Sequence, residues 1–250
     1  MRLTDDTAFL KQVTKKEGVV GDSFPLNLPA VRRLETLHFH PNVTYIVGEN
    51  GMGKSTLLEA LAVGLGFNPE GGSMNFSFSN YDSHSNLHES IRIGRGAQRP
   101  RDGFFFRAET FYNVATHIEA LDASSEPGPR VIDSYGGTSL HEQSHGESFF
   151  AAFMNRFGGK GLYILDEPEA ALSPLRQLSM LSRIHDLVQD GSQFVISTHA
   201  PILMAYPNSR MIQLTSEGMS EVRIEETEHY VIMKQFFDDR ERMLHHLFQS

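Results

Sequence analysis

With 250 residues, of which 40% are hydrophobic and 21% charged, the chain has the composition of a folded globular protein, which argues against wholesale disorder. Its formal net charge is −9, and all of this excess lies in residues 101–250, with 12 basic and 21 acidic side chains. This balance argues against a broad nucleic-acid face, because phosphate binding needs a concentration of Lys and Arg. The absence of Cys removes disulfides, thiolate metal sites and cysteine nucleophiles together.

The sequence offers no sign of a membrane or secretory segment. No apolar run approaches the roughly 20 residues that span a bilayer. The first 18 residues are acidic and polar, where a secretion signal is basic and then apolar. We therefore expect a cytoplasmic protein.

In the first half of the chain, LETLHF and VTYIV are strand-like runs, separated by a Pro-Asn turn, and the second ends at Gly48. Residues 54–67 predict a helix of strong helix formers. Residues 71–103, rich in Gly, Ser and Asn, leave loop and irregular sheet open as alternatives. GFFFRAE then predicts a buried strand, TFYNVATHIEAL a helix, and DASSEPGPR a connector.

The second half alternates helices with apolar strands. A helix is predicted over residues 146–157, and GLYILDE reads as a fully buried strand. Ser173 and Pro174 are a good N-cap and first-turn pair for a helix that ends before Gly191. QFVIS predicts another buried strand, MIQLTSEGMSEVRIE a hairpin, and TEHYVIMKQFF and DDRERMLHHLF terminal helices. This order predicts an α/β fold around a largely parallel sheet.

The segment GENGMGKS fits the phosphate-loop pattern G-x-x-x-x-G-K-[ST], and it lies between a predicted strand and a predicted helix. Glycines let the backbone N–H groups turn toward a phosphate chain, and the helix N-terminus adds partial positive charge. Lys54 is expected to reach the β- and γ-phosphates, and Ser55 to ligate Mg²⁺. The predicted nucleotide-binding residues here are Gly48, Glu49, Asn50, Gly51, Met52, Gly53, Lys54, Ser55 and Thr56.

Two further strand ends carry polar residues. At the tip of GLYILDEP, Asp166 is expected to hold Mg²⁺ through water, and Glu167 to polarise the attacking water. A glutamate beside the Mg²⁺ aspartate indicates hydrolysis rather than binding alone. QFVIS is followed by Thr198 and His199, and a histidine at this position is a candidate sensor of the γ-phosphate, although a lone His is more often structural.

The stretch SHGES has two interpretations, and both can hold at once. Ser144 and Glu147 form a capping box, and a capped helix N-terminus is also an anion site. With the phosphate loop, the DE strand and STH in order, SHGE resembles the signature motif of ABC-type ATPases, which is usually Ser-Gly-Gly-Gln or Ser-Gly-Gly-Glu. The resemblance covers residues 31–215 in motif order.

The resemblance implies an ABC-type P-loop NTPase core sheet, with a small antiparallel β part and a short helical signature subdomain. It implies one domain over residues 1–250: a phosphate-loop lobe (1–105 and 160–215), a helical signature lobe (about 106–159) and C-terminal helices (226–250). It further implies an ATP-dependent homodimer with two composite sites that use ATP and Mg²⁺. By position, the residues that act in trans are Ser144, Gly146 and Glu147, the catalytic residues are Glu167 and His199, and the metal residues are Ser55 and Asp166.

Two positions depart from the family's pattern. His145 replaces the first signature glycine, which puts close backbone approach to phosphate in doubt there. For the Mg²⁺-sensing loop residue, Gln98 and Glu109 are both candidates, and the adenine-stacking residue is unassigned. His141 and His145 are four apart, as in a zinc pair, but a helix cap at Ser144 separates them.

DEPEAALSP followed by STHAPIL resembles the soluble branch of this class, which includes RecF, SMC and OLD-type ATPases, whereas transport subunits usually read DEPTSALD. The leading hypothesis is therefore a Mg²⁺-dependent ATPase that couples closure to a partner, with DNA or a DNA-associated complex as a candidate. The alternatives are an energy subunit of a membrane transporter and a nucleotide-gated interaction module. A basic cluster that could meet DNA, or be a solvated loop, is Arg92, Arg95, Arg99 and Arg101.

Overall fold

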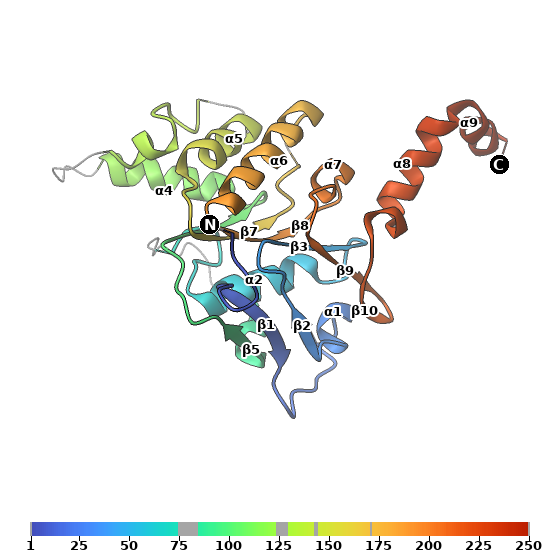
Figure 1. The fold of residues 1–250 in the computed structure, drawn as a ribbon, viewed down its shortest axis with the longest axis horizontal. Coiled ribbons are helices and arrows are strands. Elements are labelled where there is room, and N and C mark those ends of the chain that lie inside the picture. Colours follow the sequence, from blue (N-terminus) through green and yellow to red (C-terminus); the bar gives the residue numbers. More distant parts are fainter. Residues whose placement is uncertain (1, 75–84, 124–129, 143–144, 171, 250) are drawn as a thin grey trace.

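The computed structural model describes residues 2–74, 85–123, 130–142, 145–170 and 172–249. Its centre is a seven-stranded sheet whose inner pairs are parallel and whose two edge strands are antiparallel (Figure 1). In spatial order the strands are β10 (Gly218–Glu221), β9 (Arg210–Thr215), β3 (Val43–Gly48), β8 (Gln193–Ser197), β7 (Gly161–Asp166), β6 (Asp102–Arg107) and β4 (Gly72–Ser73). The predicted α/β fold with a largely parallel sheet is confirmed.

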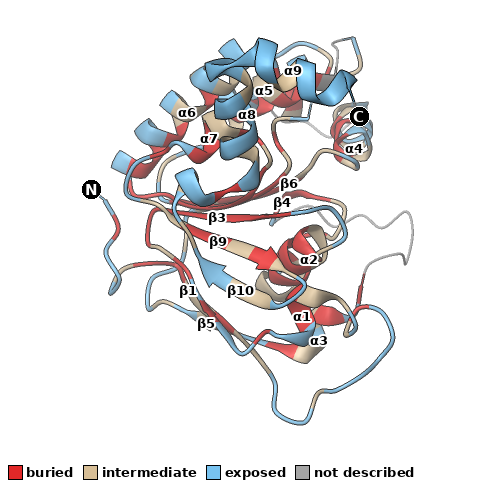
Figure 2. Ribbon diagram, turned by 90° about the vertical axis from the view of Figure 1, so that its right-hand side faces the viewer, coloured by how far each residue is buried: buried red, intermediate tan, exposed pale blue. Residues whose placement is uncertain are grey.

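Helices cover both faces of this sheet, which explains why its central strands are mainly apolar and fully buried. Every residue of β3, β7 and β8 is buried. On one face lies α2 (Lys54–Leu65), and on the other lie α4 (Phe111–Ala123), α5 (His145–Arg156) and α6 (Pro174–Gln189), as Figures 1 and 2 show. The described part of the chain thus has two hydrophobic cores, one on each face of the sheet.

Several predicted boundaries agree with the structure. The helix predicted over residues 54–67 begins at Lys54 as predicted, and it ends two residues earlier than predicted, at Leu65, because Gly66 takes a left-handed φ of 100° as its C-cap. The hydroxyl of Ser173 accepts a hydrogen bond from the backbone N–H of Arg176, so the predicted N-cap of α6 is confirmed. The hairpin is also confirmed as β9 and β10, although the chain after Glu221 continues into a 3₁₀ turn, Ile224–Glu226, instead of a strand.

A second, three-stranded antiparallel sheet lies below α2, in the order β2 (Thr36–His38), β1 (Leu10–Lys15) and β5 (Ile91–Arg95). It shares its core with α2, so this helix is packed between two sheets (Figure 2). The sequence did not predict β1, and β5 lies in the region left open between loop and sheet. The remaining short helices are α1 (Pro29–Arg32), α3 (Leu87–Ser90), α7 (Pro201–Met204) and the 3₁₀ helix Val131–Tyr135.

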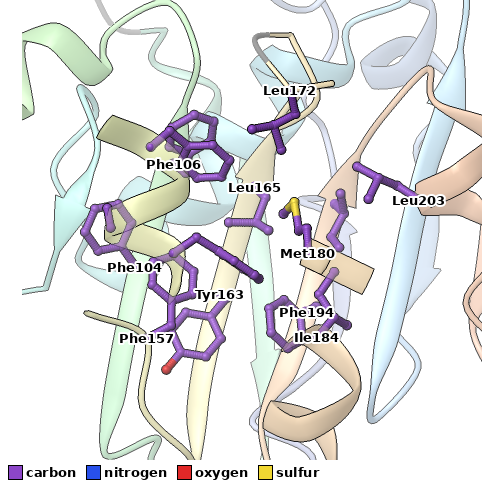
Figure 3. Close-up of a cluster of buried hydrophobic side chains, with 14 of the residues drawn as sticks. Phe104, Phe106, Phe157, Tyr163, Leu165, Leu172, Met180, Ile184, Phe194 and Leu203 are labelled. Atoms are coloured by element: carbon purple, nitrogen blue, oxygen red, sulfur yellow. The ribbon is translucent and has the colours of Figure 1, made fainter. Parts of the chain in front are cut away.

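The opposite face is fixed by aromatic side chains (Figure 3). Phe149 of α5 stacks on Phe106 of β6 with ring centroids 3.7 Å apart, and Phe157, just after α5, stacks on Tyr163 of β7 at 4.4 Å. Aromatic pairs of this kind stabilise a core beyond the area they bury. The helix that follows the signature segment is therefore held firmly against the central sheet.

The two predicted terminal helices are confirmed as α8 (Glu228–Asp238) and α9 (Arg240–Phe248), which together form a C-terminal arm. Neither helix contains a buried residue, and Figure 1 shows the arm reaching away from the body. Among the described residues, no helix is long and apolar enough to cross a membrane.

Candidate nucleotide site

The predicted phosphate loop joins β3 to α2, and its geometry depends on glycine. Gly48 has a φ of 140°, and a Cβ there would lie 2.3 Å from the carbonyl oxygen of Leu214. Gly53, with a φ of 96°, is the residue before α2. These are conformations that L side chains rarely adopt, so the loop can curl only because glycines stand at these two positions.

Lys54, the first residue of α2, is buried, and its side chain folds back over the loop. Its ammonium donates to the carbonyl oxygens of Gly48 at 2.8 Å and Glu49 at 3.0 Å. Burial lowers the pKa of Lys54, although the carboxylates of the site oppose that shift. A cation is thus held at the mouth of a loop whose backbone is shaped for an anion.

Asp166 lies at the end of β7 and meets hydroxyl groups from two other elements. Its Oδ1 accepts hydrogen bonds from Ser197 of β8 at 2.5 Å and from Ser55 of α2 at 3.2 Å. Burial raises the pKa of Asp166, while these two hydrogen bonds and the Arg107 guanidinium lower it. The structure therefore brings the two predicted metal residues, 111 positions apart, into contact.

Glu167 and His199 lie side by side at the ends of β7 and β8. Glu167 has a left-handed φ of 50°, and its backbone N–H donates to both the carbonyl and the hydroxyl oxygen of Ser197, each at 3.1 Å. The Nε2 of His199 is 3.3 Å from the Oε1 of Glu167 but is not aligned for a hydrogen bond with it. Burial, followed by the charge of Lys54 and by His229, lowers the pKa of His199 to about 4.

Three residues of the site were not predicted. Glu169 accepts a hydrogen bond from the backbone N–H of His199 at 2.5 Å, and burial raises its pKa. The Nε of Arg107 lies 4.0 Å from Asp166, and its guanidinium pairs with Glu59 at 2.6 Å. His229, from the arm, is hydrogen-bonded to His199 at 2.9 Å. Only Arg107 had a sequence signal, as a charge at the end of the apolar run FFFR.

The side chains present fit a magnesium ion and a phosphate chain. The hydroxyl of Ser55 and the carboxylate of Asp166 are oxygen ligands of the kind that Mg²⁺ prefers, and they converge on one point. Beside them, Oε2 of Glu169 and Nε2 of His199 are buried without a hydrogen-bond partner. Unpartnered buried polar atoms are rare in folded proteins and call for a ligand or water.

The signature residues lie elsewhere. Ser144 is outside the described residues, and Gly146 is buried in the first turn of α5. Glu147 is exposed and accepts a hydrogen bond from Arg176 at 3.3 Å. It lines a surface hollow with Phe150, Met154 and Arg176, and no phosphate-loop residue lines this hollow. In the described part of the chain, Glu147 thus lines a different hollow from the one lined by Gly48, Glu49 and Met52 of the phosphate loop.

The candidates for a Mg²⁺-sensing residue are both exposed. Gln98 lies between β5 and β6, and Glu109 contacts Arg107 at 3.8 Å with 86% of its side chain exposed. His141 packs edge-on against Tyr112 at 4.6 Å. The side chain of His145, the other histidine of the zinc alternative, lies outside the described part of the structure.

This arrangement of loop lysine, serine and paired acids has the parts of a P-loop nucleotide site. A family described as an AAA domain matches residues 25–119. The chain is 30% identical over 200 residues to a Streptomyces avermitilis protein whose name is that of an ABC transporter ATP-binding protein. The match covers 75% of this chain and 34% of that protein. It is 28% identical to the hemin import ATP-binding protein HmuV of Pseudomonas aeruginosa, covering 68% of this chain and 71% of HmuV.

Among solved structures, a dimeric ATP-binding cassette bound to ADP and phosphate is similar, with a TM-score of 0.49 and 16% identity over 88% of this chain and 99% of that chain. This chain spans about a third of the length of the Streptomyces relative. In its phosphate loop, its paired acids and these sequence matches, the chain is similar to P-loop ATP-binding proteins of the ABC and AAA class.

Proposed function

We propose that the chain binds ATP with Mg²⁺ between two copies of itself and hydrolyses it. The observation that carries the proposal is the 3.2 Å contact between Ser55 of the phosphate loop and Asp166 at the end of β7. This contact brings a phosphate-binding element and a metal-binding carboxylate to one point. A charged Lys54 beside them supplies the positive charge that a triphosphate needs.

The residues have distinct roles in this proposal. The backbone N–H groups of residues 48–53 and the ammonium of Lys54 bind the phosphates, and Ser55 and Asp166 hold the metal ion. Mg²⁺, when bound, neutralises charge on the phosphate oxygens. Glu167, which follows β7 and lies beside His199, accepts a proton from the attacking water. His199 donates from Nε2, which is buried and unpartnered beside Glu167.

A second copy would complete the site. Glu147 lies on an exposed surface of α5 and lines a different hollow from the one lined by Gly48, Glu49 and Met52 of the phosphate loop. In the proposed dimer, the N-terminus of α5, with Ser144, Gly146 and Glu147, meets the phosphates bound by the other copy, where its partial positive charge favours them.

The test is the solution mass of Glu167→Gln, measured by light scattering with and without Mg-ATP. Without hydrolysis the closed state should persist, so the mass should rise from near 28.1 kDa to about twice that value. Glu167→Gln with Lys54→Ala is the control, because it cannot bind the phosphates and should not shift. A mass that ignores ATP in a protein shown to bind it would refute the composite site.

For the partner, the relatives favour the transporter alternative over DNA. Both proteins described above are named as ATP-binding proteins of transport systems. We therefore propose that closure supplies energy to a membrane-embedded partner. ATP turnover should then be indifferent to added DNA. Stimulation by DNA that is lost when Arg92, Arg95, Arg99 and Arg101 are neutralised would instead support the DNA hypothesis.

A further inference from the structure

The first turn of the C-terminal arm lies against the nucleotide site. His229, the second residue of α8, is half-buried and lines a cavity of about 120 Å³ together with Gly48, Glu49 and Met52 of the phosphate loop. Its Nε2 lies 2.9 Å from the Nδ1 of His199, and the two ring centroids are 4.7 Å apart. An element that is otherwise remote from the body therefore contacts a predicted catalytic residue directly.

The neighbours of His199 determine which of its ring nitrogens carries the proton. On one side, Nε2 faces the Oε1 of Glu167 at 3.3 Å, and an ionised carboxylate can only accept hydrogen bonds. A proton on Nε2 is therefore favoured, because the alternative would set two acceptors against each other. Since the pKa of His199 is about 4, the ring is neutral at pH 7 and carries one proton, so its Nδ1 must accept.

We propose that His229 is a positioning residue that donates from its Nε2 to the Nδ1 of His199 and so keeps the proton of His199 on Nε2, facing the γ-phosphate. The proposal rests on the function proposed above. It follows the general rule that the hydrogen bond made by one imidazole nitrogen fixes the tautomer and orientation of the other. The ring contact between His199 and His229 also fixes the orientation of the His199 ring.

The position of α8 is fixed by its own cap. Thr227 is buried, its hydroxyl donates to the carbonyl of Ile224 at 2.7 Å, and the same oxygen accepts from the N–H of Tyr230 at 3.4 Å. The rest of α8 and all of α9 have no buried residue. A shift of α8 by about 1 Å would take the 2.9 Å contact beyond hydrogen-bonding distance, so the position of the arm sets the state of His199.

The experiment compares His229→Phe, His229→Gln and the control His246→Phe. Phenylalanine keeps the ring but cannot donate, glutamine restores an N–H donor, and His246 is an exposed residue of the same arm on α9. For Mg-ATP turnover, His229→Phe should lower kcat on the order of 10- to 100-fold and change KM less than about twofold. Losses of this size are typical when the group that orients a metal-ligating histidine is removed. His229→Gln should recover most of the loss, and His246→Phe should match the wild type.

A second readout does not depend on turnover. In ¹⁵N-histidine spectra of the nucleotide-free protein, His199 should show a protonated Nε2 and a bare Nδ1, and His229→Phe should lose this pattern while His229→Gln keeps it. A protonated Nδ1 on His199 in the wild type, or equal kcat in His229→Phe and His246→Phe, would overturn the proposal. If the wild type does not hydrolyse ATP, the proposed function fails, and the spectra still decide the role of His229.

Discussion

The hydroxyl of Ser197 connects the two acids of the site, so Ser197→Ala should damage both stability and metal binding. This fully buried hydroxyl donates to Asp166 at 2.5 Å and accepts from the N–H of Glu167 at 3.1 Å. The N–H of Glu167 keeps a second acceptor, the Ser197 carbonyl, so the main loss falls on the Asp166 carboxylate. A hydrogen bond to a charged group contributes about 1.5–3 kcal/mol, and that is the expected loss in the free energy of unfolding.

Ser192→Ala is the matched control, because Ser192 is fully buried next to the opposite end of β8. Its hydroxyl accepts from the N–H of Gly161 at 3.2 Å and donates to the carbonyl of Gly158 at 3.5 Å. Both partners are neutral, so the substitution should lower the free energy of unfolding by only about 0.5–1.5 kcal/mol. Urea unfolding of both variants measures this difference. Ser197→Ala should also raise the pKa of Asp166 further and therefore raise the Mg²⁺ concentration needed for half-maximal turnover, whereas Ser192→Ala should not. Equal losses of stability together with unchanged Mg²⁺ dependence would refute this account.

Three further predictions concern the loop, a histidine and the core. Gly48→Ala should lower the free energy of unfolding, measured in urea, by more than about 2 kcal/mol, because the new Cβ would lie 2.3 Å from the carbonyl oxygen of Leu214 in β9. Gly51→Ala is the control: its φ of 81° is also left-handed, but the space around it is open, so the loss should be about 1 kcal/mol. The pKa of His199 is about 4 in the folded protein and 6.5 in the unfolded chain, so protons bind preferentially to the unfolded state below pH 6.5. Between pH 7 and pH 5, the free energy of unfolding, measured by denaturant titration, should therefore fall by up to about 2 kcal/mol more in the wild type than in His199→Gln. Phe149→Ala should cost about 3–5 kcal/mol by thermal or urea unfolding, against less than about 0.5 kcal/mol for the exposed Met154→Ala; similar losses in the two would contradict the stacking seen in the core.

The central sheet was predictable because burial on both faces imposes a pattern that survives in the sequence. Strands β3, β7 and β8 are buried at every position and mainly apolar, and polar residues follow each of them. The strand β1 was missed for a physical reason. Its two fully buried residues, Leu10 and Val13, are three apart because a bulge shifts the register between Leu10 and Gln12, which breaks the alternation of two that marks a half-buried strand.

Some residues of the site were likewise predictable from the sequence, and others were not. The carboxyl ends of neighbouring parallel strands meet at one edge of a sheet, so residues that follow β3, β7 and β8 had to lie near one another. This rule predicts the proximity of Lys54, Asp166 and His199 from order alone. It says nothing of His229, which reaches the edge only because the 3₁₀ turn and the Thr227 cap set the direction of α8. A residue placed by such an irregular connection leaves no periodic pattern in the sequence. The contact between His229 and His199, through which the arm reaches the site, could therefore be found only in the structure.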